Sequence, residues 1–409
     1  MKILLLSQYF PPEFGACAAR NSEHAAEWAA MGHEVTVLTT FPNYPSGIVD
    51  ERYRGKLYTR ETRDNYRILR TWSYATPNRA VWKRGLASVS FMLCAFLGGI
   101  LACRGNDVII ASSGPFFVGP LGYLLSRLTG AALVFEVRDI LPQQAVDVGM
   151  IRNKVIIRVL EAIENFLYRA ASAVVVVAEA SRCTLISKGV PAQKCFTIEN
   201  GILPQLFAPG CAGDDVRAQH GWSDDFIAMY IGVHGVSQGL FTLLDAAKLL
   251  EKEEKIRFVF VGDGAAKPAL QEYAHTHGIR NVEFLPVKEH KDIAAYYAAS
   301  NACLVPLLKG AYFQINIPSK IFEIMASSRP IVLGAEGQAR EIIEKSAGGL
   351  AVQPESAEEF ASAILRLLND RSLAEHLGEN GRSYVLQHHD RRAKAALYVR
   401  LIEEVLQKS

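Results

Sequence analysis

The chain has 409 residues, of which 50% are hydrophobic and 21% charged, with 44 lysines and arginines against 42 aspartates and glutamates. At roughly 100 to 200 residues per domain, this length predicts two domains, or three, each large enough to bury a core, and the apolar fraction excludes a disordered or fibrous protein. A formal net charge of +2 does not indicate a nucleic-acid-binding protein.

The cysteines and the N-terminus both favour a cytoplasmic setting. The seven cysteines contain no CxxC pair and no zinc-like spacing, and an odd number would leave one thiol unpaired in an oxidising compartment. The first apolar run, 1–6, is followed closely by 9–13 (YFPPE), where a signal peptide needs a longer apolar region. We therefore expect residues 2–7 to form a buried strand and not an export signal.

Short apolar runs rich in valine and isoleucine recur along the chain between helix-like stretches. Runs that do not alternate between apolar and polar residues are typical of parallel strands covered on both faces, and the amphipathic segments between them supply the crossovers. The runs form two successive sets: 2–7, 34–39, 107–111, 132–137, 173–177 and 195–198, then 226–231, 256–261, 282–285, 303–305, 331–333 and 349–352. We therefore predict an α/β protein with two doubly wound parallel sheets of the Rossmann type.

The strand pattern pauses between 200 and 210, where turn-forming residues and prolines connect the two sets. We predict an N-terminal Rossmann-like domain over 1–205 and a second Rossmann-like domain over 206–389. The last stretch, 390–409, has apolar residues at helical spacing. It is predicted to be an amphipathic helix that is able to pack on the first domain.

In such sheets ligands bind beyond the carboxyl ends of the strands, so the loops after strands are the candidate sites. The loop 232–239 (GVHGVSQG) follows a predicted strand and precedes a predicted helix, so its glycines allow backbone amides to approach an anion. The loop 262–264 (GDG) follows the next strand. A plain turn is the alternative for both loops, and neither matches GxGxxG or the P-loop, which argues against an NAD enzyme or a kinase.

A third segment, 316–326 (NIPSKIFEIMA), reads as the start of a helix, with Pro318 suited to the first turn and Ser319 and Lys320 at the positive end. Lys320 and Glu323 are three residues apart and therefore share a helix face. They form either a weak surface ion pair or a functional pair, in which the lysine binds a phosphate and the glutamate accepts hydrogen bonds from ribose hydroxyls.

These segments recur in a fixed order along nearly the whole chain: 9–16 with Arg20, 32–37, 200–201, 232–239, 262–264, 284–286 and 318–326. Their order resembles that of retaining GT-B glycosyltransferases of the family-4 type, which include sucrose synthase and mannosyltransferases of bacterial envelopes. Within that family, two segments resemble the subgroup that contains N-acetyl-L-fucosamine transferases of bacterial surface-polysaccharide biosynthesis. They are residues 137–142 (VRDILP) and Pro318-Ser319-Lys320 with Glu323.

The chain departs from the family pattern in two ways. Ile315 stands where the family carries a glutamate eight residues before Glu323. The phosphate loop has His234 and Gln238 where the family commonly offers an arginine and a lysine. Whether His234 and Gln238 bind the diphosphate therefore stays open, and Lys320 is the leading source of positive charge.

The resemblance implies two domains that face a central cleft, with a role for each matched residue. The implied catalytic residues are Asp139, Lys320 and Glu323. The implied donor-binding residues are Gly232, His234, Gly235, Gln238, Gly239, Gly262, Gly264, Pro286, Val287, Ile317, Pro318, Ser319, Lys320 and Glu323. The implied acceptor and cleft residues are Gly15, Ala16, Arg20 and Asp139.

Within this set, Lys320 with the amides of Gly235 and Gly239 would hold the diphosphate and Glu323 the ribose. The backbone near Pro286 and Val287 would contact the base. Gly15 and Ala16 would lie across the cleft, near the diphosphate and the acceptor. Asp139 either contacts sugar hydroxyls or serves as a helix cap or salt-bridge partner. Arg20 either serves a phosphate or lies on a solvated helix face.

The resemblance further implies a retaining, metal-independent transfer of a sugar, N-acetyl-L-fucosamine or another hexose derivative, from a UDP-linked donor. The acceptor would be a lipid-diphosphate-linked saccharide in the assembly of O-antigen, capsule or exopolysaccharide. No D-x-D triplet occurs, so we expect no metal and no cofactor besides the nucleotide-sugar co-substrate. A non-catalytic sugar-nucleotide-binding subunit of an envelope complex and a GT-B sugar-nucleotide epimerase are the alternatives.

A basic stretch runs directly into an apolar one. Ten lysines and arginines lie between 51 and 84 against three acidic residues, and 85–103 carries no charge. With Trp72, Tyr74 and Trp82 as anchors, residues 52–103 are predicted to bind the anionic inner face of the cell membrane and to make the enzyme peripheral. The alternatives are a membrane-spanning helix and a solvated basic face beside a core helix. We expect no nucleic-acid partner, and the sequence leaves the oligomeric state open.

Overall fold

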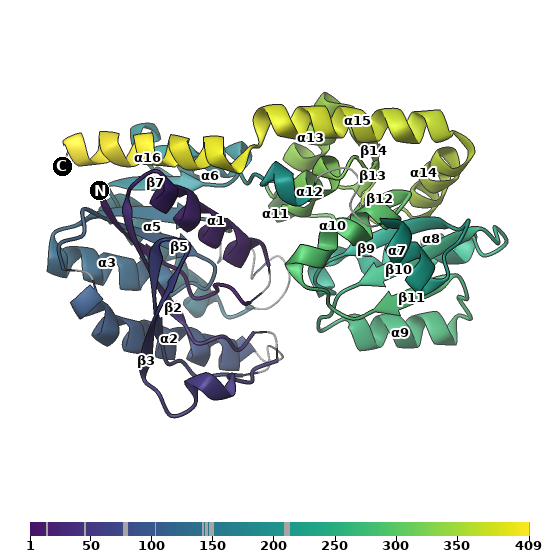
Figure 1. Cartoon of the computed structure of the whole chain (residues 1–409). Helices are drawn as coiled ribbons and strands as arrows, with labels where there is room; N and C mark the ends of the chain where they lie inside the picture. Colours follow the sequence, from purple (N-terminus) through teal and green to yellow (C-terminus); the bar gives the residue numbers. More distant parts are fainter. Residues whose placement is uncertain are drawn as a thin grey trace. The chain divides into compact units, whose positions relative to one another are not determined.

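The computed structural model describes residues 1–13, 15–44, 46–76, 81–102, 104–140, 143, 146, 151–207 and 213–408. The chain divides into two compact units (Figure 1): unit 1 comprises 1–200 with 391–409, and unit 2 comprises 201–390. The predicted boundary, after residue 205, lies within the 3₁₀ turn Pro204–Phe207 of unit 2.

Unit 1 contains, within the described residues, an eight-stranded sheet in the order β3-β4-β2-β1-β5-β6-β7-β8. β3 runs antiparallel to β4, and the other neighbours are parallel. The strand order reverses at β1, which pairs with both β2 and β5, so the edge between β1 and β5 is the topological switch point. The strands are β1 (Lys2–Leu6), β2 (Glu34–Thr40), β3 (Tyr58–Arg63), β4 (Tyr66–Thr71), β5 (Val108–Ser113), β6 (Ala132–Val137), β7 (Ala173–Val176) and β8 (Cys195–Thr197).

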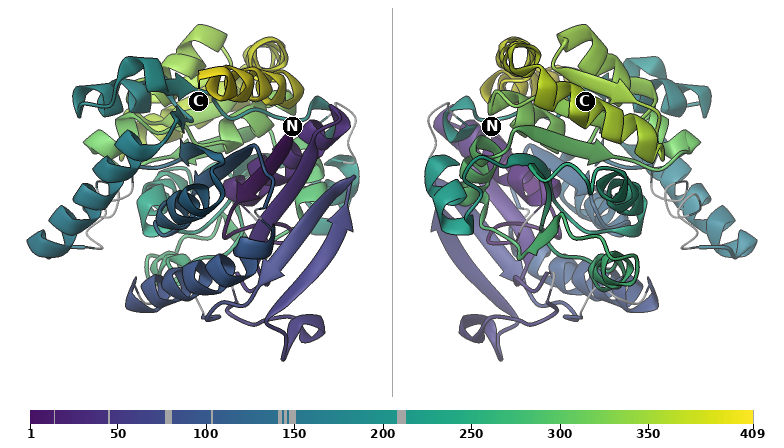
Figure 2. Two further views of the ribbon diagram at one scale, coloured as in Figure 1. Left: turned by 90° about the vertical axis from the view of Figure 1, so that its left-hand side faces the viewer. Right: turned by 90° about the vertical axis from the view of Figure 1, so that its right-hand side faces the viewer.

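Helices cover both faces of this sheet, as Figures 1 and 2 show. α1 and the C-terminal α16 cover one face, where Trp28 and Tyr398 pack in the core and the Trp28 indole N–H donates to the Ala395 carbonyl at 3.2 Å. α2 and α3 lie on the other face, where a Cβ at Gly99 of α2 would lie 3.0 Å from Leu38 and 3.2 Å from Leu125, so the glycine allows close packing. The helices are α1 (Ala16–Ala30), α2 (Val81–Ala102), α3 (Val118–Thr129), α5 (Lys154–Ala170), α6 (Glu179–Ser187) and α16 (Arg391–Lys408), with 3₁₀ turns at Glu51–Tyr53 and Ala192–Lys194.

Unit 2 contains a six-stranded sheet, within the described residues, in the order β11-β10-β9-β12-β13-β14, and all its neighbours are parallel. The order reverses between β9 and β12, which marks the ligand-binding edge of such a sheet. The strands are β9 (Phe226–Ile231), β10 (Ile256–Val261), β11 (Val282–Leu285), β12 (Ala302–Pro306), β13 (Ile331–Gly334) and β14 (Gly349–Val352). The helices are α7 (Gly213–His220), α8 (Leu240–Leu249), α9 (Lys267–Thr276), α10 (His290–Ala299), α11 (Ala311–Gln314), α12 (Lys320–Ala326), α13 (Gly337–Ser346), α14 (Ala357–Asn369) and α15 (Arg371–His388).

The prediction of two doubly wound sheets is confirmed, and all twelve predicted strands are present within two residues of their predicted ends. The sequence analysis missed the hairpin β3–β4. Its turn is Asp64-Asn65, and both residues have positive φ, 45° and 64°, as a two-residue hairpin of this type requires. The prediction failed because β3 carries charged residues on its exposed positions, so the segment reads as a basic surface and not as a strand.

Candidate active site

The carboxyl edge of the unit 2 sheet brings together the two glycine loops that follow β9 and β10. The Gly232 amide donates to the Val261 carbonyl at 3.0 Å, and the His234 amide donates to the Asp263 carbonyl at 2.8 Å. A side chain at Gly262 would overlap the carbonyl of Gly232, so only glycine allows the two backbones to approach this closely. The two loops therefore form one rigid layer at the switch point of the sheet.

Lys320 lies above this layer, at the first residue of α12. Its Nζ is 4.0 Å from the centre of the Tyr230 ring, and it would lie 2.6 Å from a Cβ at Gly232. The Tyr230 hydroxyl is within hydrogen-bonding distance of the Val233 carbonyl, at 2.8 Å, and of Gln238 Oε1, at 3.2 Å. Tyr230 thus offers Lys320 an aromatic face, and the missing side chain of Gly232 leaves room for the ammonium.

The electrostatics at Lys320 are those of a cation without a counter-ion. No carboxylate of a described residue lies within ion-pair distance of its Nζ. Burial lowers the pKa of Lys320 to about 7, although the negative charge of Glu323 acts to raise it. The alternative of a surface ion pair between Lys320 and Glu323 is therefore wrong. Glu323 instead accepts a hydrogen bond from the Tyr297 hydroxyl at 3.4 Å, and its Oε1 is 3.9 Å from His290 Nε2.

His234 lies in the loop after β9, as predicted, but its ring is in the interior of unit 2. Its side chain is fully buried, and both ring nitrogens lack a hydrogen-bond partner within the part of the chain that is described. The ring packs near Tyr230, Phe260 and Phe284, and burial, with help from the neighbouring lysines, lowers its pKa to about 4. His234 is therefore neutral at neutral pH, which leaves Lys320 as the source of positive charge at this edge, and a donor-binding role for His234 stays a prediction.

The other predicted donor residues surround the same edge. Gln238 is partly buried beside Tyr230, and Gly235 opens the 3₁₀ turn Val236–Gln238. Gly239 starts α8 with a φ of 61°. Pro286 and Val287 are exposed after β11, as contacts to a base require. In the segment before Lys320, Ile317 is buried and Pro318 and Ser319 are half-buried.

Lys267 is a residue of this edge that the sequence analysis missed. Its Nζ donates to the Gly262 carbonyl at 2.7 Å and to the Leu285 carbonyl at 2.8 Å. The lysine therefore holds the loop after β10 against the end of β11. A lysine in the first turn of a helix is common, so nothing in the sequence distinguished Lys267 from a surface residue.

In unit 1, the predicted acceptor residues have different positions. Gly15 and Ala16 are exposed at the start of α1, where Gly15 has a φ of 117° that favours glycine. Asp139 follows β6 and is half-buried. Phe14, Leu141 and Pro142, which belong to the motifs at these positions, lie outside the described residues.

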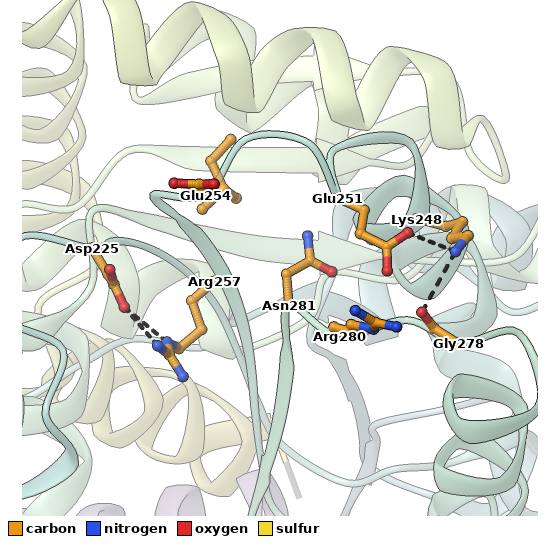
Figure 3. A pocket seen from close by; sticks show the side chains of 9 residues that line it. Asp225, Lys248, Glu251, Glu254, Arg257, Gly278, Arg280 and Asn281 are labelled. Carbon is orange, nitrogen blue, oxygen red and sulfur yellow. Dashed lines mark hydrogen bonds and ion pairs between the residues drawn. The ribbon is translucent and has the colours of Figure 1, made fainter.

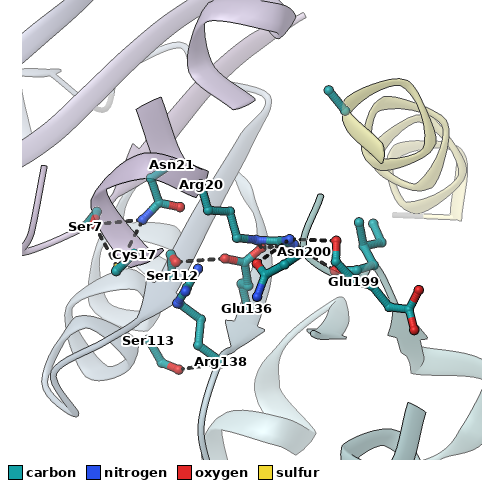
Figure 4. A network of polar contacts seen from close by, with 12 residues as sticks. Ser7, Cys17, Arg20, Asn21, Ser112, Ser113, Glu136, Arg138, Glu199 and Asn200 are labelled. Atoms are coloured by element: carbon teal, nitrogen blue, oxygen red, sulfur yellow. Dashed lines mark hydrogen bonds and ion pairs between the residues drawn. The ribbon is translucent and has the colours of Figure 1, made fainter. Parts of the chain in front are cut away.

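Arg20 is buried and paired within unit 1, so the alternative of a solvated helix face is wrong. The side chain is 1% exposed and pairs with Glu136 at 3.0 Å. It also donates to the carbonyls of Ile198 and Glu199 at 2.9 Å (Figure 4). Arg20 therefore joins α1 to the sheet, and its guanidinium is used within the fold.

A hollow of about 630 Å³ in unit 2 lies at the other edge of the sheet, beside the amino ends of β10 and β11 (Figure 3). Four of its charges form two ion pairs, Arg257 with Asp225 at 2.8 Å and Lys248 with Glu251 at 2.6 Å. Because these charges are satisfied and the loops of the switch point are absent there, this hollow is not the candidate active site. Within the described residues, no group of three histidines, cysteines or carboxylates could hold a metal ion.

The predicted basic surface is weaker than the sequence suggested, because most of its arginines are paired. Arg70 is buried against Glu61. Four exposed arginines pair with acidic neighbours: Arg52 with Asp50, Arg54 with Glu51, Arg63 with Asp64, and Arg67 with Glu34. Arg79 and Cys103, also in the predicted membrane segment, lie outside the described residues.

α2 is long and apolar enough to cross a membrane by length and composition alone. One of its faces packs in unit 1 through Phe91, Ala95 and Gly99. The opposite face is exposed and apolar, and its large side chains are Trp82, Leu86, Leu93 and Leu97, each at least 45% exposed. We call these four residues the outer face of α2.

Two family models match the chain, one in each unit. The model described as "Glycosyl transferase 4-like domain" matches residues 15–201, and "Glycosyl transferases group 1" matches residues 214–384. The Escherichia coli (strain K12) protein named as the colanic acid biosynthesis glycosyl transferase WcaI is 28% identical over 378 residues, which cover 90% of this chain and 92% of the relative. The alpha-D-kanosaminyltransferase of Streptomyces kanamyceticus is 26% identical over 265 residues, 63% of this chain and 67% of that protein.

Solved structures share the fold over the whole chain. The sucrose-phosphate synthase of Thermosynechococcus elongatus matches with a TM-score of 0.80 at 21% identity and covers 100% of both chains. Anabaena Alr3699/HepE, solved in complex with UDP and glucose, matches with a TM-score of 0.75 at 18% identity, over 98% of this chain and 99% of that one. At these identities the likeness defines the fold, which is GT-B.

Proposed function

Because this chain is a glycosyltransferase with the GT-B fold, we propose that it transfers a sugar from a UDP-linked donor, bound at the carboxyl edge of unit 2, with retention of the anomeric configuration. The observation that carries this proposal is the position of Lys320 above the glycine loops, with no ion-pair partner among the described residues. The structures of Anabaena Alr3699/HepE, solved with UDP and with UDP-glucose, support UDP as the nucleotide.

Lys320 would act on the leaving group. As the bond from the sugar to the diphosphate breaks, negative charge grows on the phosphate oxygens, and a fixed cation lowers the energy of that state. The loop amides of Gly235 and Gly239 would add hydrogen bonds to the same oxygens, and Glu323 would accept hydrogen bonds from the ribose. We propose that the reaction needs no metal, because these groups supply the charge stabilisation that a metal would otherwise give.

We propose a lipid-diphosphate-linked saccharide as the acceptor, in the assembly of a bacterial surface polysaccharide. Support comes from the relatives, whose names include colanic acid biosynthesis and capsular polysaccharide biosynthesis. Asp139, at the carboxyl end of β6, would contact hydroxyls of the acceptor. The donor sugar is N-acetyl-L-fucosamine or another hexose derivative.

A panel of nucleotide sugars, each incubated with and without a lipid-diphosphate saccharide, tests this function through release of UDP. Release that requires the acceptor supports a transferase. A change of the sugar without acceptor would make the protein an epimerase, and binding without turnover would make it a non-catalytic subunit. Lys320→Ala and Glu323→Ala should each lower kcat/KM at least tenfold, about 1.4 kcal/mol, whereas Lys248→Ala, at the other edge of the sheet, should not.

We further propose that the enzyme is cytoplasmic and peripheral, and that the outer face of α2 contacts the membrane surface. An exposed apolar helix face with a tryptophan at one end suits the interface of a bilayer. Because the neighbouring arginines are paired, we expect the apolar contacts to contribute more than the charges. Leu93→Ser with Leu97→Ser should reduce sedimentation with anionic vesicles more than Arg63→Ala with Arg67→Ala. Equal loss in both variants would contradict this.

A further inference from the structure

Arg138 is a cation of unit 1 that the proposed chemistry has not used. It is the first residue after β6, and its backbone N–H donates to the hydroxyl of Ser113 at 3.0 Å. The residue is half-buried, yet its Nη1 is covered and has no hydrogen-bond partner among the described residues. Figure 4 shows the side chain pointing back from the end of β6 toward Ser112 and Cys17.

The interior guanidinium groups of unit 1 are otherwise paired with a carboxylate. Arg20 pairs with Glu136 at 3.0 Å, Arg70 with Glu61 at 3.0 Å, and Arg391 with Glu23 at 2.6 Å. Among the described residues, no carboxylate lies within 4.0 Å of the Arg138 side chain. Glu136, two residues earlier, is already bound by Arg20 and by the Ser112 hydroxyl at 2.8 Å.

The position of Arg138 is that of a ligand-binding residue. The loops after β1, β5 and β6 meet at the switch point of the unit 1 sheet, where Gly114 lies against Tyr9 and Cys17. Arg138 is close enough to Cys17 to oppose the burial that raises the pKa of its thiol. The cation therefore lies among the residues that line the ligand edge.

The Arg138 guanidinium has no hydrogen-bonded carboxylate among the described residues, so its attraction to the buried Glu136 balances its lost hydration only in part. A bound anion would balance it, and the planar fork of arginine donors suits the oxygens of a phosphate. The donor-binding groups that the proposed function uses lie in unit 2, so we assign the anion bound in unit 1 to the acceptor.

We propose that Arg138 binds a phosphate of the acceptor and so selects diphosphate-linked acceptors over neutral saccharides. The proposal rests on the proposed function, since it assumes a transfer to such an acceptor. It assigns Arg138 to substrate binding and not to the fold.

The test compares Arg138→Met with Arg20→Met. Arg138→Met should raise the KM for a short-chain polyprenyl-diphosphate saccharide at least tenfold, leave the affinity for UDP unchanged, and keep or raise Tm. Arg20→Met should lower Tm, because it leaves Glu136 buried without its cation. Arg138→Lys should restore part of the acceptor affinity. A fall of Tm in Arg138→Met like that of Arg20→Met, or an unchanged KM, would overturn the proposal.

Inorganic pyrophosphate, titrated in the presence of saturating UDP, separates this inference from the proposed function. Binding by the wild type that is lost in Arg138→Met supports the anion site even if the chosen saccharide is not a substrate. If Arg138→Met instead weakens UDP, the anion belongs to the donor and the proposal is wrong. Equal use of a diphosphate-linked and a neutral saccharide by the wild type would also overturn it.

Discussion

Raising the pH through 7 should remove the proton from Lys320 and with it the ability to use the donor. The ordinary pKa of lysine is 10.5, and burial beside Tyr230 lowers it to about 7 in the free protein. The charged form is the one that attracts a diphosphate, so it is present below pH 7 and lost above it. At pH 8.5 only about one molecule in thirty would carry the proton, so kcat/KM for the donor should fall about thirtyfold from its low-pH plateau.

The assay is kcat/KM for the nucleotide sugar between pH 6 and 9, at saturating acceptor. Lys320→Arg is the matched control, because its guanidinium keeps its charge throughout this range and should abolish the alkaline decline. Glu323→Gln removes the carboxylate that opposes the effect of burial, so it should move the decline to lower pH. A flat wild-type profile, or a decline that persists in Lys320→Arg, would refute the assignment of the charge to Lys320.

Three further substitutions follow from the contacts. Gly232→Ala puts a methyl group 2.6 Å from the Lys320 ammonium and should lower kcat/KM at least tenfold. Gly278 also has a positive φ, but a methyl group there would meet open space, so Gly278→Ala should change only Tm. Burial raises the pKa of Glu13 to about 7, although hydrogen bonds from three backbone amides oppose this rise. The free energy of unfolding, measured with urea, should therefore fall by up to about 3 kcal/mol between about pH 4.5 and pH 7. Glu13→Gln should remove this pH dependence. His234→Leu removes a buried, unpartnered ring, so the free energy of unfolding should not fall and donor use should persist.

The strands were predictable because parallel strands covered on both faces need continuous apolar sequence. Residues 132–137 and 226–231 are such runs, and both are strands at the predicted positions. The hairpin strand Tyr58–Arg63 has no such signature, since it lies at the edge of the sheet with its side chains largely in solvent. Its only local signal was Asp64-Asn65, a turn pair that could have indicated a hairpin between the two tyrosine-led segments.

The site was predictable to the level of the loops and not of the side chains. Strand ends and glycines placed 232–239 and 262–264 at one edge, because topology fixes which loops meet. The burial of His234 depends on the packing of both loops against Phe260 and Phe284, which no local pattern contains. For the same reason the aromatic support of Lys320 by Tyr230 was missed, since that tyrosine reads as one more residue of a buried strand.

Charge was the least predictable property, because its effect depends on pairing and not on number. The stretch 52–70 is rich in arginines, yet five of them have carboxylate partners, so the field that they project is weaker than their count suggests. Lys320 and Arg138 lie in stretches with no excess of charge, but each lacks a carboxylate partner among the described residues and stands at the ligand edge of its sheet. A cation kept unpaired costs stability until an anion arrives, so the binding energy of that anion includes relief of this cost. We therefore expect Lys320 in unit 2 and Arg138 in unit 1 each to favour the binding of a diphosphate, independently of the other.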